Sequence, residues 1–129
     1  MAEKIVSHED LVVYKKSFEA AMSVFWESQV FPKEERYSLT DQVRRSSRSV
    51  AANITEAWRK RRYEAAFISK LSDAETEAAE TQTWLKFAVA CGYPESRRGE
   101  DLRSDYDEIL RMIVSMIQRP ERWIIVSKL

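Results

Sequence analysis

The sequence predicts an all-α fold, an antiparallel up-down-up-down four-helix bundle. The chain of 129 residues contains only two glycines and three prolines, which is well below ordinary usage. A chain so poor in turn-forming residues has few turns and therefore long elements, whereas a β-sandwich or barrel would need a turn about every 8–12 residues. Four amphipathic segments with short connections pack most simply as such a bundle.

The first expected helix runs from about residue 7 to residue 31. Ser7 and Asp10, three residues apart, form a capping box. The helix carries two apolar stripes at helical spacing, although a bundle helix needs only one. The first stripe consists of Leu11, Tyr14, Phe18, Ala21, Met22 and Phe25, and the second of Val13, Ala20 and Val24. We expect the first stripe to face the core and the second to be free for a subunit contact.

The second expected helix runs from about residue 39 to residue 58, after a second Ser-x-x-Asp start at Ser38 and Asp41. Its narrow apolar face consists of Leu39, Val43, Val50, Ile54 and Ala57. A polar stripe lies beside that face and consists of Gln42, Ser46, Ser49, Asn53 and Glu56. Two interpretations of this stripe stay open. Small polar residues allow two helices to approach closely and satisfy each other, or the stripe contacts a subunit or a ligand.

The third and fourth expected helices cover about residues 63–91 and 100–118. The apolar face of the third consists of Phe67, Leu71, Ala74, Ala78, Leu85 and either Ala88 or Val89. Gly92 is suited to end this helix in the left-handed conformation. The inward residues of the fourth are Leu102, Tyr106, Ile109, Ile113 and Met116. We expect one domain over residues 1–129, with a short C-terminal tail from about residue 119.

The residue inventory argues against catalysis. His8 is the only histidine, and we expect it to be a solvated residue in the first turn. Cys91 is the only cysteine, and we expect it to be a small buried hydrophobe. The acids of the third helix are expected to form a solvated face: Asp73, Glu75, Glu77 and Glu80. Without CxxC, HExxH or Glu-x-x-His motifs, the sequence predicts no enzyme, no metal site and no cofactor.

Charge is segregated along the chain, although the formal net charge is zero. Residues 36–62 carry eight arginines and lysines against two acids, whereas residues 63–91 carry five acids against two lysines. These charges either neutralise each other between neighbouring helices or subunits, or the basic residues bind nucleic-acid phosphates. The candidate nucleic-acid-binding residues are Arg44, Arg45, Arg48, Arg59, Lys60, Arg61 and Arg62.

The chain has more apolar residues than one small bundle can bury. Large exposed aromatic patches usually mark interfaces, and tryptophan and tyrosine are favoured anchors there. The sequence therefore predicts a homo-oligomer. The candidate interface residues are Val13, Ala20, Val24, Trp26, Gln42, Ser49, Asn53, Glu56, Trp84, Phe87 and Trp123.

The start of the chain does not resemble a signal peptide, and no run reaches the roughly 20 apolar residues of a membrane span. A single cysteine fits a reducing compartment. We expect a cytoplasmic protein without membrane contact.

The run SLTDQVRRSSRSVAANITEA resembles the four-helix bundle proteins first noticed as products of intervening sequences in bacterial large-subunit ribosomal RNA genes. The matching residues are Gln42, Arg44, Arg45, Ser49, Asn53, Ile54 and Glu56. The run YEAAFISKLSDAETEAAETQTWL fits the third helix of that family, and the resemblance covers roughly residues 10–117. The family usually has glycine where this chain has Ala57. The second helix therefore ends near the RKRR run or continues through a kink into RKRRYEAAF.

The resemblance implies an antiparallel bundle that assembles as a ring, commonly a pentamer. Related accessory proteins of diversity-generating retroelements form basic rings that bind nucleic acid and a reverse transcriptase, and the zero net charge of this chain departs from that basic subgroup. Two functions stay open. The chain is a non-enzymatic oligomer that binds RNA or DNA through the basic face of the second helix, or it is a protein-interaction scaffold without nucleic-acid contact.

Overall fold

The computed structural model describes residues 4–93 and 95–125, and this part of the chain contains helices and no strands. The four long helices are α1 (Val12–Ser28), α2 (Leu39–Arg59), α3 (Glu64–Cys91) and α4 (Ser96–Gln118). Three short 3₁₀ helices are η1 (His8–Asp10), η2 (Lys33–Glu35) and η3 (Pro120–Arg122). The all-α prediction is confirmed. None of the described helices combines the length and the apolar character that a membrane crossing requires.

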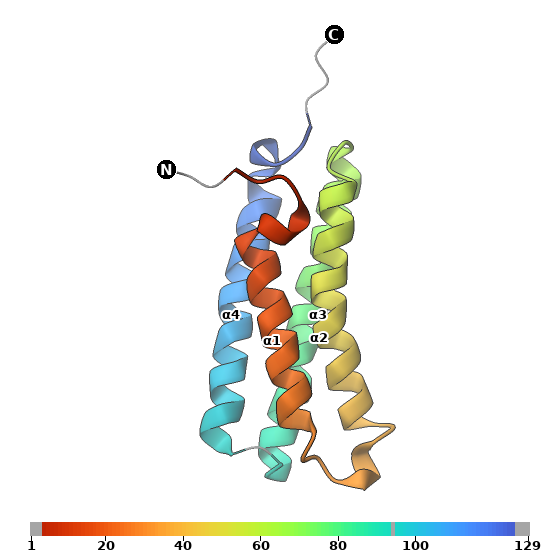
Figure 1. Ribbon diagram of the computed structural model, residues 1–129, viewed down its shortest axis with the longest axis vertical. Helices are drawn as coiled ribbons and strands as arrows, with labels where there is room; N and C mark the ends of the chain where they lie inside the picture. The colour runs from red at the N-terminus through yellow and green to blue at the C-terminus, as the bar shows by residue number, and fades with distance from the viewer. Residues whose placement is uncertain (1–3, 94, 126–129) are drawn as a thin grey trace.

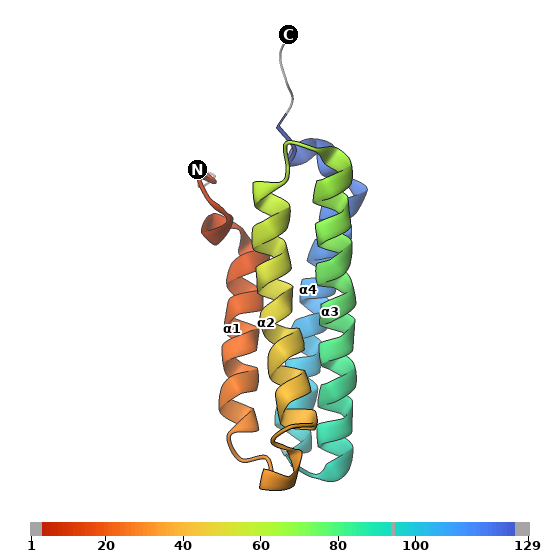
Figure 2. The same ribbon diagram turned by 90° about the vertical axis from the view of Figure 1, so that its right-hand side faces the viewer.

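The connections between the helices lie at alternating ends of the molecule (Figures 1 and 2). The α1–α2 and α3–α4 connections share the lower end, and the α2–α3 turn lies at the upper end together with η3. Consecutive helices therefore run in opposite directions. α1 contacts α2 and α4, and α3 contacts the same two helices, so the molecule is an up-down-up-down bundle.

The predicted core faces of α2, α3 and α4 are confirmed, because each predicted residue is buried, with Ala88 the last of the α3 face. Small polar residues complete these faces. Ser46 and Thr81 are buried, and the Thr81 hydroxyl donates to Ser46 Oγ at 2.8 Å across the α2–α3 contact. This pair is consistent with the first interpretation of the polar stripe at one position, since it satisfies two polar groups where the helices approach closely.

The prediction for the two faces of α1 holds for Leu11, which is buried in the core, and is wrong for the rest of the helix. Val13, Ala20 and Val24 lie in the core, whereas Phe18 is 51% exposed and Met22 is 39% exposed. Buried Ser17 and Ser28 complete the inner face, which therefore consists of small residues spaced three or four apart. Small side chains let α1 approach the other helices closely, whereas larger side chains would overpack that space. The larger apolar side chains consequently lie on the outside.

The predicted capping residues can be compared with the observed helix ends. The Ser7–Asp10 capping box is present, but it caps η1, and α1 begins only at Val12. The second expected cap is wrong, because the Ser38 hydroxyl donates to Glu35 Oε1 at 2.6 Å and does not cap α2. Gly92 has φ of 79° and ends α3 as expected. The backbone N–H of Tyr93 donates to Ala88 O and closes this terminus.

α2 and α3 are two separate helices. α2 ends at Arg59, and residues 60–63 form the turn before α3 begins at Glu64. The alternative of a kinked, nearly continuous helix is therefore wrong. Because the turn reverses the chain, the RKRR run lies at one end of the bundle.

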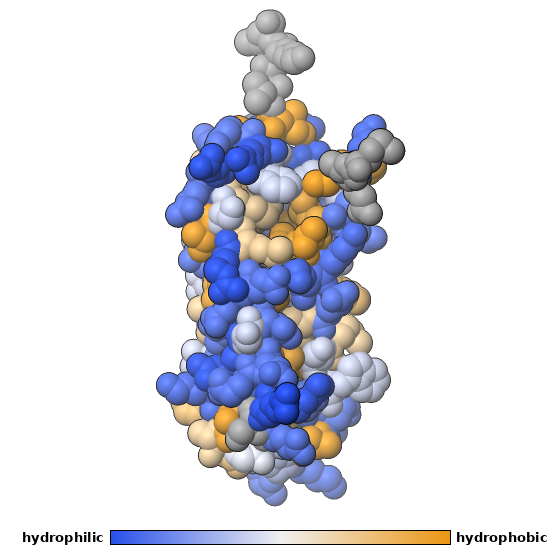
Figure 3. All heavy atoms as spheres, turned by 90° about the vertical axis from the view of Figure 1, so that its left-hand side faces the viewer, coloured by the Kyte–Doolittle hydropathy of each residue, from blue (hydrophilic) through white to orange (hydrophobic). Residues whose placement is uncertain are grey.

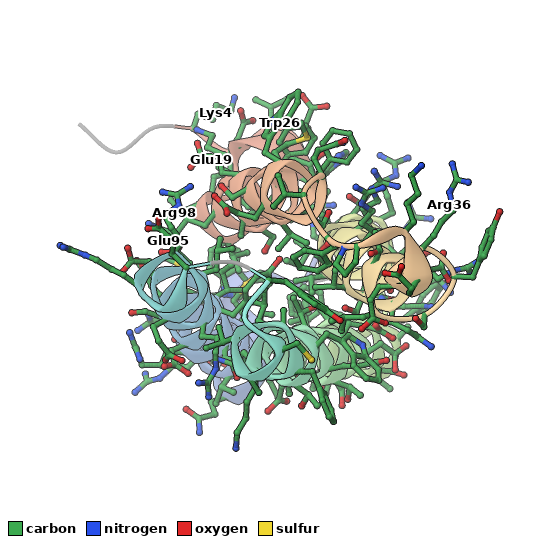
Figure 4. All side chains as sticks on the ribbon, turned by 90° about the horizontal axis from the view of Figure 1, so that it is seen from below. Lys4, Glu19, Trp26, Arg36, Glu95 and Arg98 are labelled. Atoms are coloured by element: carbon green, nitrogen blue, oxygen red, sulfur yellow. The ribbon has the colours of Figure 1, made fainter. Side chains whose placement is uncertain are left out.

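We call residues 27–38, 92, 93 and 95–98 the neutral end of the bundle, because they contain four basic and four acidic residues. Glu35 Oε2 accepts a hydrogen bond of 2.8 Å from the Tyr93 hydroxyl, which joins η2 to the end of α3. Arg98 forms an ion pair of 2.7 Å with Glu27 and joins α4 to α1. Figure 4 shows this end from below, with Arg98 beside α1 and Trp26 pointing away from the bundle.

Candidate nucleic-acid interface

Arg44 holds two helices together. Its Nε donates to Ser28 Oγ at 2.8 Å, and its guanidinium lies over the Phe25 ring at 4.9 Å. Both contacts reach from α2 to α1. Arg44 is half-buried, and these contacts give it a structural role that sequence reasoning did not assign.

Arg45 and Arg48 are exposed on the side of α2. Arg45 Nε lies 2.8 Å from Asp41 Oδ2 in an ion pair one helical turn apart. The Arg48 guanidinium lies 5.8 Å from the centre of the Phe25 ring. We call Arg44, Arg45 and Arg48 the side cluster.

The side cluster borders acids of α3. A cavity of about 600 Å³ lies between α2 and α3. It is lined by Gln42, Arg45, Ser46, Arg48, Ser49, Ala52, Glu77 and Glu80. Burial and the nearby Glu80 charge raise the pKa of Glu77 above its ordinary value. The expectation of a fully solvated acidic face therefore holds for exposed Asp73 but not for half-buried Glu77.

The other members of the polar stripe pair locally or with α3. Asn53 Nδ2 donates to Ser49 Oγ at 3.0 Å. Lys70 Nζ lies 2.8 Å from Glu56 Oε2. This ion pair joins basic and acidic helices as the neutralisation interpretation requires, and the hydrogen bonds of the pair raise the pKa of Lys70.

The four cations of the α2–α3 turn have a different environment. Arg61 stacks on the Trp58 ring at 3.8 Å, and its Nη1 donates to the Trp58 carbonyl oxygen at 2.7 Å. Arg59, Lys60 and Arg62 are exposed. Within residues 4–93 and 95–125, none of these four forms an ion pair. Partial burial and then the charges of Arg59 and Arg62 lower the pKa of Arg61.

The C-terminal segment adds two cations that the sequence analysis did not single out. The backbone N–H of Ile125 donates to the Arg61 carbonyl oxygen at 3.0 Å. This bond fastens the segment after α4 to the α2–α3 turn, and Figures 1 and 2 show η3 and that turn at the same end of the bundle. Arg119 and Arg122 are exposed there. The sequence analysis placed a C-terminal tail from about residue 119, but no sequence pattern indicated the partner of this segment.

We call residues 59–64 and 119–125 the basic end. It contains six arginines and lysines against Glu64 and Glu121. Arg48 and Arg59 are eleven residues apart on one helix, which is about 16 Å at the helical rise of about 1.5 Å per residue. The predicted basic residues therefore form two separate groups, the side cluster and the basic end.

The candidate interface residues divide in the same way. Val13, Ala20 and Val24 are buried inside the bundle and cannot form a surface contact. Trp26 is 64% exposed and Phe87 is 55% exposed. Phe18, Met22 and Trp26 follow each other at four-residue spacing, so they form one continuous strip on the outside of α1, which we call the outer ridge. The outer ridge therefore lies on the outside of α1, where we had expected the stripe of Val13, Ala20 and Val24.

Trp84 and Trp123 have partners within the chain. Trp84 is half-buried, and its Nε1 donates to Glu80 Oε1 at 3.2 Å. Trp123 packs against the core and borders a cavity of about 630 Å³ between the start of α1 and the end of α4. Figure 3 shows this face, where hydrophobic residues gather in the upper half of the view. No sequence signal indicated this cavity.

The residues considered for catalysis lie far apart in the fold. His8 is half-buried and packs edge-on against the Tyr14 ring at 4.9 Å. Cys91 is exposed, which corrects the expectation of a buried filler, because α3 ends at this residue and the core does not extend past it. Across the part of the chain that is described, no three His, Cys, Asp or Glu side chains are grouped to hold a metal ion.

Comparisons with known proteins place the chain among relatives. The sequence model described as 23S rRNA-intervening sequence protein matches residues 9–115. A solved structure of a protein of unknown function, from the S23 ribosomal protein family of Bacteroides thetaiotaomicron, is similar in fold with a TM-score of 0.76. The two sequences are 32% identical, and the match covers 83% of this chain and 96% of that one. No curated protein matches the chain.

Proposed function

Because this chain belongs to the family of 23S rRNA-intervening sequence proteins, we propose that it is a non-enzymatic oligomer that binds nucleic acid through the basic residues of α2 and its following turn. The observation that carries the proposal is the group of exposed, unpaired cations Arg59, Lys60 and Arg62 within the described residues. Cations without acidic partners keep their charge available for phosphates. The overall charge balance is zero, so the attraction depends on this local excess.

Salt dependence tests nucleic-acid binding. The wild-type protein is titrated into a fluorescent 20-nucleotide RNA of mixed sequence, from about 50 mM to about 500 mM salt. Each phosphate contact contributes about −0.7 to the slope of log K against log salt for a single strand. We expect a slope near −2 or steeper and little dependence on base sequence. Absence of binding at about 50 mM salt would end this proposal.

The proposed oligomer rests on the outer ridge. Phe18, Met22 and Trp26 expose apolar surface along α1, and such a surface is typical of an interface. The same observation supports the second candidate function, a protein-interaction scaffold. We propose a ring of identical subunits, with the pentamer that the family resemblance implies as the favoured form.

Light scattering tests the assembly. We expect a particle of about five times the chain mass of 15.1 kDa. The double variant F18K/W26K places two charges on the ridge and should return monomers, because buried unpaired charges are costly. Val6→Lys, at a valine that is 73% exposed outside the ridge, is the matched control and should leave the particle mass unchanged. A wild-type monomer at micromolar concentration would contradict the assembly.

We assign the chain no catalytic role. Its single histidine lies before α1 and its single cysteine ends α3, so the two lie at opposite ends of the bundle. A nucleophile and its base must lie within hydrogen-bond reach. The carboxylates Glu77 and Glu80 are the nearest alternative, and mutating both to glutamine should leave nucleic-acid binding intact. Hydrolysis of the bound RNA by wild type, lost in that variant, would refute the assignment.

A further inference from the structure

We propose that the basic end, and not the side cluster, is the surface that binds the strand, and that it selects single-stranded nucleic acid over duplex. The inference rests on the proposed function and makes it specific. Two groups of observations carry it, one concerning charge and the other concerning an exposed aromatic ring.

The first step concerns which cations of each basic group are already paired within the protein. In the side cluster, Arg44 is committed to Ser28 and Phe25, and Arg45 is paired with Asp41. Glu77 and Glu80 line the same cavity as Arg45 and Arg48. A phosphate at the side cluster would therefore meet two cations that already have partners and two carboxylates that repel it. Only Arg48, which lies 5.8 Å from the Phe25 ring, has no hydrogen bond or ion pair among the described residues.

The second step is the way in which the fold concentrates charge at the basic end. The turn alone supplies four cations, and the hydrogen bond from Ile125 to Arg61 fastens the segment that carries Arg119 and Arg122 to the same end of the bundle. The basic end contains six cations and only two acids. Among the described residues none of the eight takes part in an ion pair. Like charges that remain unneutralised attract a polyanion strongly at low salt.

The third step is the aromatic ring. Tyr63 follows Arg62 directly in the chain and is 67% exposed, so the basic end offers one exposed aromatic ring. Exposed aromatic rings in a basic patch stack on the bases of single strands. Bases in a duplex are already stacked on each other and offer no free face. Phosphate attraction together with one stacking platform therefore favours an unpaired strand.

The first experiment compares probes and tyrosines. Binding of the full chain is measured by anisotropy at about 50 mM salt, with a 20-nucleotide RNA and with a duplex of the same sequence. Tyr63→Leu should weaken single-strand binding about fivefold or more and leave duplex binding unchanged, and Tyr63→Phe should restore it. The matched control is Tyr37→Leu, since Tyr37 is 87% exposed beside Arg36 at the neutral end. Equal affinity for both probes, or equal effects of the two leucine variants, would overturn the inference.

The second experiment compares the two basic groups. The triple variant R59Q/K60Q/R62Q should weaken binding at about 50 mM salt by about 100-fold and reduce the salt slope by about 2. The pair R45Q/R48Q should change affinity less than about threefold. Arg61 is left intact, because it holds Trp58, and circular dichroism verifies the folding of each variant. If the pair weakens binding as much as the triple, binding is not confined to the basic end and this inference fails, whereas the proposed function still stands. If wild type binds no nucleic acid, both proposals fail.

Discussion

The two ends of the bundle contain eight charged residues each, yet they use them differently. At the neutral end, Glu35 accepts a bond from Tyr93 and joins η2 to the end of α3, and Glu27 accepts bonds from Arg98 and joins α1 to α4. At the basic end, order comes from Arg61 stacked on Trp58 and from the backbone bond of Ile125. The charged groups of the neutral end that stabilise the fold are therefore already paired. Within the described part of the chain, the exposed cations of the basic end are unpaired, because an aromatic ring and a backbone bond stabilise that end instead.

The largest expected effect concerns the apolar anchor of the basic end. Trp58 is 7% exposed, and Trp58→Ala should cost about 3–5 kcal/mol of the free energy of unfolding, because it leaves a cavity and removes the platform under Arg61. Urea denaturation measures this loss. Tyr37→Ala is the control at the neutral end, where the 87% exposed ring predicts a change within about 0.5 kcal/mol. Equal losses in both variants would contradict the comparison.

The second prediction gives the neutral end the charge of the basic end. E34K/E95K exchanges two exposed acids for lysines and leaves six cations against two acids beside exposed Tyr37. In the R59Q/K60Q/R62Q background this variant should regain RNA affinity by up to about 50-fold at about 50 mM salt. Anisotropy measures the gain. No gain would mean that charge and an exposed ring do not suffice and that the geometry of the α2–α3 turn is required.

The third prediction uses pH. Hydrogen bonds from the Ser38 and Tyr93 hydroxyls hold the pKa of Glu35 below its ordinary value of 4.5, and that of Tyr93 is raised to about 12. Because the folded pKa of Glu35 is below the unfolded one, its stabilisation is present above about pH 4.5 and is lost as the pH falls through the folded pKa. Melting temperatures of wild type and Glu35→Gln should differ at pH 7 and converge towards pH 3.

Tyr93→Phe removes one of these hydrogen bonds and should show a smaller difference with the same pH dependence. For the raised pKa of Tyr93 the sign is opposite, since stabilisation is complete below pH 10 and is lost as the pH rises through about 12. Absorbance of tyrosinate in alkaline titration follows this group, and the step near pH 12 should vanish in the phenylalanine variant. Buried Tyr106, whose pKa is raised further by burial, should still ionise at higher pH in both proteins. A difference in melting temperature between wild type and Glu35→Gln that stays constant from pH 7 to pH 3 would refute the prediction for Glu35.

The smallest expected effect is the repulsion within the basic end. Arg62 is exposed, and its charge contributes to the lowered pKa of Arg61. Arg62→Gln should therefore stabilise the fold by a few tenths of a kcal/mol at low salt, and the gain should disappear near 1 M salt, where charges are screened. Lys33→Gln at the neutral end is the control and should show no such gain. Destabilisation by Arg62→Gln at low salt would indicate an ion pair in place of repulsion.

The sequence located the core where the apolar pattern was unambiguous. The faces of α2 and α4 followed from residues such as Val50 and Ile113, because these two helices are apolar mainly on one side. The face of α3 followed from the helical spacing of residues such as Phe67. On α1 both faces are apolar, and periodicity alone cannot rank them. The choice depends on volume, since Ser17, Ala20 and Val24 fit close to neighbouring helices and Phe18 and Trp26 do not.

The candidate site followed the same division. The RKRR run was enough to name Arg59, Lys60 and Arg62, because consecutive cations form a local positive charge whatever the fold. Arg44 was named as a candidate for binding phosphates. Its contacts with Ser28 and Phe25 could not be predicted, because these residues lie on another helix. The local charge of an element can be read from its residues, but the partners of each charge come from distant segments.

The helices, the core stripes of α2, α3 and α4 and the segregation of charge are therefore properties of the sequence alone, because each depends on neighbours three or four residues apart. The tertiary structure decided which face of α1 is buried, which arginines are committed and which remain free. It also fastened the segment after α4 to the α2–α3 turn, through a bond between Ile125 and Arg61 that joins residues 64 positions apart. Contacts of that range depend on the geometry of the whole bundle, and no local pattern encodes them.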